Sequence, residues 1–276
     1  AKLEGVKAVI KARDEFKGIV DVQVVAFPQD GLVREPGAED LIREAMDLGA
    51  DVVGGIPWIE YTEDDERTHI QKMVALAKER GKMVSMLVDD AGDPTLKTLE
   101  MLAVETIKQG LEGRVLAQHA RAMCLYPKPY FQKLVALLKR AGIGVVTDPQ
   151  TGPLHARVKE LLAEGALVCV GQDDISDAYY PYGRNNMLEC AFLASHLLWM
   201  TTETEMETLY DMITVNGAKA MCVENFGLEP GNDAHLVVLP VKSVLEAFRY
   251  QDAPRYVVSH GKLIAESVET ATYHFG

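Results

Sequence analysis

The sequence predicts an α/β protein in which helices surround a parallel sheet. Short apolar, β-branched runs alternate with helix-periodic stretches at a spacing of roughly 25–40 residues, which is typical of consecutive strand–helix units. The run at 168–170 is apolar on both faces and leads into Gly171, as expected for a strand covered on two sides. Two adjacent carboxylates, Asp173 and Asp174, follow it. A length of 276 residues suits one large α/β domain with a small appendage.

Six runs are predicted to be strands. They cover residues 20–27, 51–57, 83–88, 115–119, 143–147 and the stretch from 168 to near 173. A closed barrel of alternating strands and helices needs eight strands. Either two strands are supplied from before residue 1, or the sheet is open.

Helix-periodic segments follow these strands. The first runs from the start of the chain to about residue 16 without a preceding cap, so we expect the chain to begin in the middle of a fold. The remaining predicted helices are 38–48, 68–80, 94–109, 130–140, 155–163, 186–199, 203–212 and 215–221. Glycine stands just past several of these ends, as at Gly81 and Gly110, where it favours helix termination.

The tail changes character after residue 231. Residues 232–240 and 256–264 are predicted to form strands of a small separate β unit, with His260 and Gly261 in the turn of a hairpin. We therefore expect a partial barrel domain over 1–231 and the C-terminal strands of a small β domain over 232–276.

Composition excludes several classes of function. The formal net charge of −13 argues against nucleic acid or an anionic membrane surface as a partner. No apolar run reaches the length of a membrane span, and no signal peptide is visible. The four cysteines are scattered without a CxxC pair, which favours reduced thiols in the cytoplasm over a zinc site.

Polar residues gather at the predicted carboxyl ends of the strands, which in a barrel face the active site. They are Gln29, Asp89, Asp90, His119, Asp148, Asp173 and Asp174. An aspartate after a strand can also be a helix cap, and His119 can be a buried structural histidine. The loop at 179–183, rich in tyrosine, either stacks on a flat ring or packs on itself.

Other catalytic classes lack their motifs. The sequence has no phosphate-binding G-x-x-x-x-G-K-[ST] loop and no G-x-S-x-G. The Cys pair of the H-x-E/P-C-x-x-C nucleobase deaminases is also absent. The paired carboxylates at the strand end could bind a metal, take a proton or hold a substrate N–H.

The chain resembles the amidohydrolase superfamily, and within it the bacterial cytosine deaminase branch and related triazine-ring amidohydrolases. The resemblance covers nearly the whole chain and lies in the segments 20–29, 49–57, 118–123, 171–174, 180–187, 227–234 and 261–264. It implies a (β/α)8 barrel of the amidohydrolase type that lacks its first strands here, with remnants of a small β-sandwich at the C-terminus.

The resemblance also implies roles for individual residues. Gln29 matches the glutamine that holds a pyrimidine ring, and His119 matches a histidine that contacts the hydrolytic water or the substrate. Asp173 matches a metal-binding aspartate that carries protons, and Asp174 matches an acid that binds a ring or amine nitrogen. Tyr179 stands where the deaminase has an aromatic lid.

Three departures concern the divalent metal, zinc or iron, that the family uses. No His-x-His pair matches the first-strand ligands, and Leu87 replaces a histidine ligand. Asp90 replaces a glutamate proton shuttle and is one methylene shorter, although it can still act as a weak general base. Asp173 is thus the clear remaining ligand, with His119 as a possible second, and we expect the metal to be absent or substoichiometric.

Two functions remain open from the sequence. One is hydrolysis of a C–N bond in a small cyclic amidine or amide. The other is a non-catalytic binding or structural subunit that keeps the ring pocket. We also expect homo-oligomers, because an open barrel exposes apolar edges.

Overall fold

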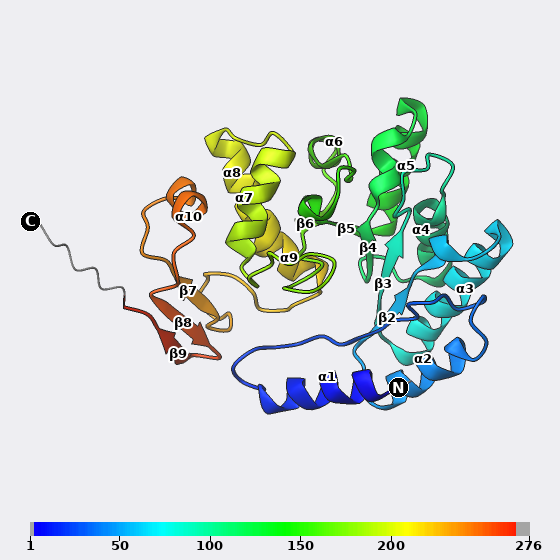
Figure 1. Cartoon of the computed structure of the whole chain (residues 1–276), viewed down its shortest axis with the longest axis horizontal. Coiled ribbons are helices and arrows are strands. Elements are labelled where there is room, and N and C mark those ends of the chain that lie inside the picture. Colours follow the sequence, from blue (N-terminus) through cyan, green and yellow to red (C-terminus); the bar gives the residue numbers. More distant parts are fainter. Residues whose placement is uncertain (1–2, 269–276) are drawn as a thin grey trace, which may run out of the picture.

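A computed structural model describes residues 3–268 and has one six-stranded parallel sheet in which the strands pair in chain order (Figure 1). The strands are β1 (Val25–Ala26), β2 (Val52–Gly55), β3 (Met83–Val88), β4 (Val115–His119), β5 (Gly144–Thr147) and β6 (Val168–Val170). Helices alternate with them, so the α/β fold of the barrel type is confirmed.

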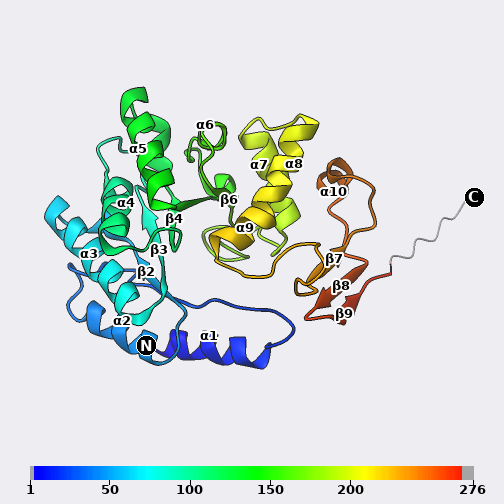
Figure 2. The ribbon, with the colours of Figure 1, turned by 180° about the vertical axis from the view of Figure 1, so that it is seen from behind.

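The α-helices, except the last, follow one another in chain order around the curved sheet, and Figure 2 shows the same order from behind. They are α1 (Glu4–Glu15), α2 (Ala38–Asp47), α3 (Glu63–Arg80), α4 (Thr98–Gln109), α5 (Lys128–Ala141), α6 (Val158–Ala163), α7 (Met187–Leu197), α8 (Glu203–Ile213), α9 (Val215–Ala220) and α10 (Val244–Tyr250). Helix α10 packs on α7 and α8 rather than on the sheet. None of these helices combines the length and the apolar character that crossing a membrane requires.

Strand alternation divides the side chains of the sheet between two faces. On β3, Val84, Met86 and Val88 are fully buried in the main core, which also contains the apolar side chains of α3 and α4. Ser85 and Leu87 alternate with them and therefore face the inner, concave side. The helix-facing side thus holds the stabilising core, and the inner side is left to form the site.

The sheet is open within the described residues, because β1 and β6 are its two edges and are not paired with each other. The predicted strand at 20–27 is wrong in its length, since only Val25 and Ala26 pair with β2. Val20 is 49% exposed and Val22 is 36% exposed. A β-branched run without a partner on either side stays extended but forms no ladder.

The tail forms a three-stranded antiparallel sheet of β7 (Leu236–Val238), β8 (Tyr256–Ser259) and β9 (Lys262–Glu266). The hairpin turn at His260 and Gly261 is confirmed, and both residues have positive φ (48° and 73°). The division at residue 231 remains a prediction, and residues 1–2 and 269–276 of its two ranges lie outside the described part.

Helix α3 starts earlier than predicted and helix α10 is an additional helix, and side-chain caps account for both. Helix α3 begins at Glu63 rather than near 68, because the Thr62 side chain accepts the Asp65 N–H at 3.2 Å. Helix α10 was not predicted; the Ser243 hydroxyl accepts the Glu246 N–H at 3.2 Å. Its Phe248 is buried in the main core, so this part of the tail packs on the barrel.

Candidate functional site

A cavity of about 290 Å³ opens on the inner side of the sheet at the carboxyl ends of its strands. Its lining residues come from the ends of β1, β3, β4, β5 and β6: Val25, Phe27, Gln29, Ser85, Leu87, Gln118, His119, Val146, Asp148, Gly171, Gln172 and Asp173. In an α/β barrel this is the end where catalytic and binding residues lie. The cavity therefore brings together Gln29, His119 and Asp173, three of the predicted site residues.

The centre of the site is a hydrogen-bonded pair of buried side chains. His119 Nδ1 lies 2.8 Å from Asp148 Oδ1. Arg121 Nη2 donates to the other Asp148 oxygen at 3.1 Å and to Thr151 Oγ1 at 2.6 Å. Asp148 thus holds the orientation of the imidazole, and Arg121 offsets its charge.

An unusual backbone at the end of β4 lets two consecutive residues reach the cavity. Strand alternation would send Gln118 and His119 to opposite faces. His119 and the following Ala120 both have left-handed backbones, with φ values of 66° and 50°. This conformation is costly for residues with a Cβ and is found preferentially at functional sites. It ends the strand and allows the His119 ring to line the cavity beside Gln118.

The electrostatics of the pair favour a protonated histidine beside an ionised aspartate. Burial lowers the pKa of His119, but the hydrogen bond to Asp148 and the charges of Asp148, Asp90 and Asp173 outweigh it and raise that pKa above its ordinary value. Burial likewise raises the pKa of Asp148, but the hydrogen bond and charge of His119 lower it overall. His119 is therefore suited to donate a hydrogen bond from Nε2.

The other carboxylates of the rim hold their protons more tightly than usual. Burial raises the pKa of Asp173 and, separately, that of Asp90. Burial together with the charges of Asp173 and Asp177 raises the pKa of Asp174 to about 6. Shifts of this kind in a cleft are typical of functional sites, because they bring an acid toward the pH at which it can exchange protons.

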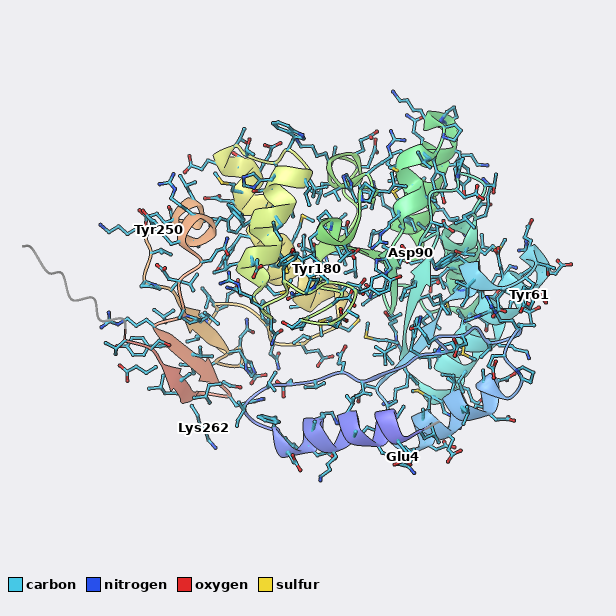
Figure 3. The ribbon with its side chains drawn as sticks, viewed as in Figure 1. Glu4, Tyr61, Asp90, Tyr180, Tyr250 and Lys262 are labelled. Carbon is cyan, nitrogen blue, oxygen red and sulfur yellow. The ribbon has the colours of Figure 1, made fainter. Side chains whose placement is uncertain are left out.

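Three of the predicted site residues do not line the cavity. Asp90 lies beside it, 3.3 Å from Arg121 Nη1 and 4.0 Å from His119 Nε2 (labelled in Figure 3). Asp174 lies next to Asp177 in the loop that leads to α7. Tyr179 in the same loop is 89% exposed. Their roles in catalysis or ligand binding remain predictions from the resemblance alone.

Three polar residues of the lining were not predicted as site residues: Ser85, Gln118 and Gln172. Gln118 Nε2 donates to Ser85 Oγ at 2.9 Å across β3 and β4. Ser85 and Gln118 lie within β3 and β4 and face the inner side of the sheet, whereas the sequence prediction named only the polar residues at the ends of these strands. The signal was available in the strand alternation, since polar residues inside apolar runs identify the face that is not packed on helices.

Asp89 and His155, which also carry possible ligand atoms, have other partners. Asp89 is fully buried and accepts hydrogen bonds from the Thr98 N–H (2.7 Å) and the Tyr126 hydroxyl (2.6 Å). It therefore caps the start of α4. His155 Nδ1 lies 3.1 Å from the Ala156 carbonyl, and neither residue lines the cavity.

Among residues 3–268, few donor atoms at the cavity are left for a divalent metal. His119, Asp148 and Asp173 have possible ligand atoms within 4.8 Å of one another. Both oxygens of Asp148 are engaged, however, one by His119 and the other by Arg121 and Thr151. His119 Nε2 and Asp173 remain, whereas Leu87 contributes only an alkyl group. Two donors fall short of the three protein ligands that a catalytic zinc needs.

Comparisons with known proteins show where this architecture recurs. A profile of the Amidohydrolase family matches residues 3–265. N-isopropylammelide isopropyl amidohydrolase of Pseudomonas sp. (strain ADP) is 32% identical over 96% of this chain, which spans 66% of that protein's length.

Two solved structures are similar over nearly all of the chain. The 5-methylcytosine deaminase from Klebsiella pneumoniae, liganded with phosphonocytosine, has a TM-score of 0.93 at 33% identity, covering 99% of this chain and 70% of that one. The N-isopropylammelide isopropylaminohydrolase from Burkholderia multivorans has a TM-score of 0.90 at 27% identity, covering 96% of this chain and 68% of that one.

Proposed function

The chain belongs to the Amidohydrolase family, and we propose that its cavity binds a small, flat, nitrogen-containing ring of the pyrimidine or triazine type. The observation that carries this proposal is the grouping of Gln29, His119 and Asp173 around one cavity of about 290 Å³. The names of similar proteins point the same way, since one acts on an isopropylammelide and another binds phosphonocytosine. By lineage the reaction is hydrolysis of a C–N bond of the ring.

The lining offers complementary groups for such a ring. Phe27, Val146 and Leu87 supply apolar walls. The Gln29 amide can donate to and accept from adjacent ring positions, whereas Asp173 accepts from a ring or amine N–H. His119 would donate from Nε2 to a ring carbonyl or nitrogen, and a charge-assisted bond of this kind is stronger than a neutral one.

Hydrolysis would also require an activated water molecule. The family typically uses a divalent metal ion for this step. The two donor atoms left at this cavity do not hold such an ion, so we derive no step through it. We propose that this chain, by itself, binds the ring without turning it over. Leu87 in the lining favours this second candidate function, a non-catalytic ring-binding protein.

Isothermal titration calorimetry with cytosine, isocytosine and triazine analogues tests ring binding. Gln29→Ala and Asp173→Asn should each weaken the best ligand about 10-fold, because each removes a side chain proposed to hydrogen-bond the ring. The resemblance assigns a contact to Asp174 as well, whereas the cavity lining favours Asp173. Asp174→Asn is therefore the matched comparison and should change affinity much less. Equal affinities for all of these variants would contradict the proposal.

We also propose which partners the chain does not bind and in which compartment it acts. With a net charge of −13, the chain should not bind nucleic acid or an anionic membrane surface. Its scattered cysteines favour the reducing cytoplasm. Absence of a mobility shift with DNA or RNA at low salt is the corresponding check.

A further inference from the structure

A second group of possible ligands lies outside the cavity lining. Asp21 belongs to the segment before β1, His235 directly precedes β7, and His260 occupies the β8–β9 turn. Their ligand atoms all lie within 4.8 Å of one another. Lys262, which starts β9 and is labelled in Figure 3, marks this hairpin beside the loop that follows α1.

The hairpin fixes the two imidazoles against each other. The ring centroids of His235 and His260 are 4.4 Å apart and the rings meet edge to face at 80°. His260 has a left-handed backbone, with a φ of 48°, a conformation in which Asn or Gly is more usual in such turns. Its backbone N–H points to His235 Nδ1 at 3.5 Å. The turn therefore places the imidazole rings of His235 and His260 next to each other.

The aspartate completes the set from a different part of the fold. Asp21 Oδ2 lies 3.1 Å from His260 Nε2. Among residues 3–268, His260 is the only basic side chain within ion-pair distance of Asp21, so no lysine or arginine competes for this carboxylate. This differs from Asp148 at the cavity, whose oxygens are already engaged by Arg121 and Thr151.

We propose that Asp21, His235 and His260 bind a divalent transition-metal ion such as Zn²⁺. Imidazole and carboxylate are ligands that suit zinc, and three of them leave a fourth position for water. With bonds of about 2.0–2.2 Å, neighbouring ligand atoms of a tetrahedral zinc lie about 3.3 Å apart. Asp21 and His260 already lie at about this spacing, and the ligand atom of His235 lies within 4.8 Å of both.

The ion would join two parts of the molecule that are distant in sequence. The segment before β1 already touches the region after α9, where Gln23 Nε2 donates to the Met221 carbonyl at 3.0 Å. A metal at Asp21 would anchor the same segment to the C-terminal sheet. Because β1 is a two-residue edge strand, this anchor stabilises the edge that carries Gln29.

The test is a zinc titration of the untagged, chelator-treated full chain by calorimetry. The wild-type chain should bind one equivalent, and His260→Gln and Asp21→Asn should each lower its affinity by at least about 100-fold, because even changes outside the ligand shell cost about 10–100-fold. Asp173→Asn, which alters the cavity instead, should leave this equivalent unchanged. The result is independent of whether the cavity binds a ring.

Cobalt(II) absorption provides a second readout of the ligand set. The wild-type chain should show visible d–d bands of a four-coordinate site, and His235→Gln should abolish them while circular dichroism shows an unchanged fold. The proposal is overturned if the wild-type chain binds no zinc, or if the bound zinc is unaffected by all three substitutions at Asp21, His235 and His260.

Discussion

His119 has its charge set by three surrounding carboxylates rather than by its own burial. Burial lowers the pKa of His119, and the hydrogen bond to Asp148 contributes most to raising it. Asp148→Asn should therefore lower the pKa of His119, which NMR titration of the imidazole would measure. Asp40→Asn, which removes an exposed carboxylate of α2, is the control and should leave the titration unchanged. An unaltered His119 titration in Asp148→Asn would show that Asp148 does not set the charge of this histidine.

The raised pKa of His119 also makes the free energy of unfolding depend on pH. A histidine whose pKa is raised on folding contributes stability that is fully present below its unfolded pKa, near 6.5, and is lost as the pH rises through the folded value. The difference in free energy of unfolding between the wild-type chain and His119→Gln should therefore shrink as the pH rises above about 6.5. Urea denaturation at a series of pH values would measure it. If the difference in free energy of unfolding between the wild-type chain and His119→Gln grows with pH, the pKa of His119 is not raised by folding.

Asp89 and Asp90, which follow β3, have different roles: Asp89 caps α4, and Asp90 lies beside the cavity. Asp89→Ala removes the acceptor for the Thr98 N–H and for the buried Tyr126 hydroxyl, and should cost about 3 kcal/mol of unfolding free energy. Asp90→Ala should cost clearly less, because Arg121 keeps its ion pair with Asp148. Urea denaturation of both variants tests this, and equal losses would mean that Asp89 is not the structural cap.

The sequence predicted the polar rim but not which of its members face the cavity. Gln29, His119 and Asp173 were predicted as site residues and line it together. Ser85 and Gln118 were missed, because the prediction named only polar residues at the ends of the apolar runs, and not those within the runs. Tyr179 could not be placed, since the path of a loop depends on packing that its own residues do not encode.

Elements were predicted best where both sides of a strand are paired. The predictions 83–88 and 115–119 agree with β3 and β4 to the residue, because each of these strands is paired with a neighbour on both sides. The prediction 20–27 failed at the sheet edge, where the same composition lacks a partner. Helix α10 was missed although Ser243 and Glu246 form the capping signal, because it lies between predicted tail strands.

The attachment of β1 depends on a glycine in β2. A Cβ on Gly54 would lie 2.5 Å from the Ala26 carbonyl oxygen and 2.9 Å from the Phe27 ring. Gly54→Ala should therefore push the edge strand away and cost about 1–3 kcal/mol of unfolding free energy. Gly5→Ala in α1 is the matched control. Its Cβ meets nothing within 4 Å, so stability should hold or rise by up to about 1 kcal/mol.

Urea denaturation compares the two glycine variants directly. Hydrogen exchange at the Val52 and Val53 amides of β2 would report whether the edge has opened. If Gly54→Ala is as stable as Gly5→Ala, the close approach of β1 to β2 does not hold this edge.

The open sheet exposes apolar residues that a closed barrel would cover. Phe16, Ile19 and Val20, in the segment before β1, are each about half exposed. We predict that the chain self-associates at micromolar concentration, because unpaired strand edges and apolar patches favour association. Val20→Lys should weaken it, whereas Leu125→Lys, at an exposed apolar residue on another face, should not. A clean monomer by light scattering would contradict this prediction.

The central claim is that the cavity keeps its ring-binding groups but lacks the donors for a catalytic metal. An ammonia-release assay on the untagged chain with cytosine, in the presence of added zinc, iron or manganese, tests it most directly. We predict no turnover above the reaction without protein, since His119 and Asp173 alone do not hold the ion. Ammonia release that requires the metal and disappears in Asp173→Asn would contradict the claim.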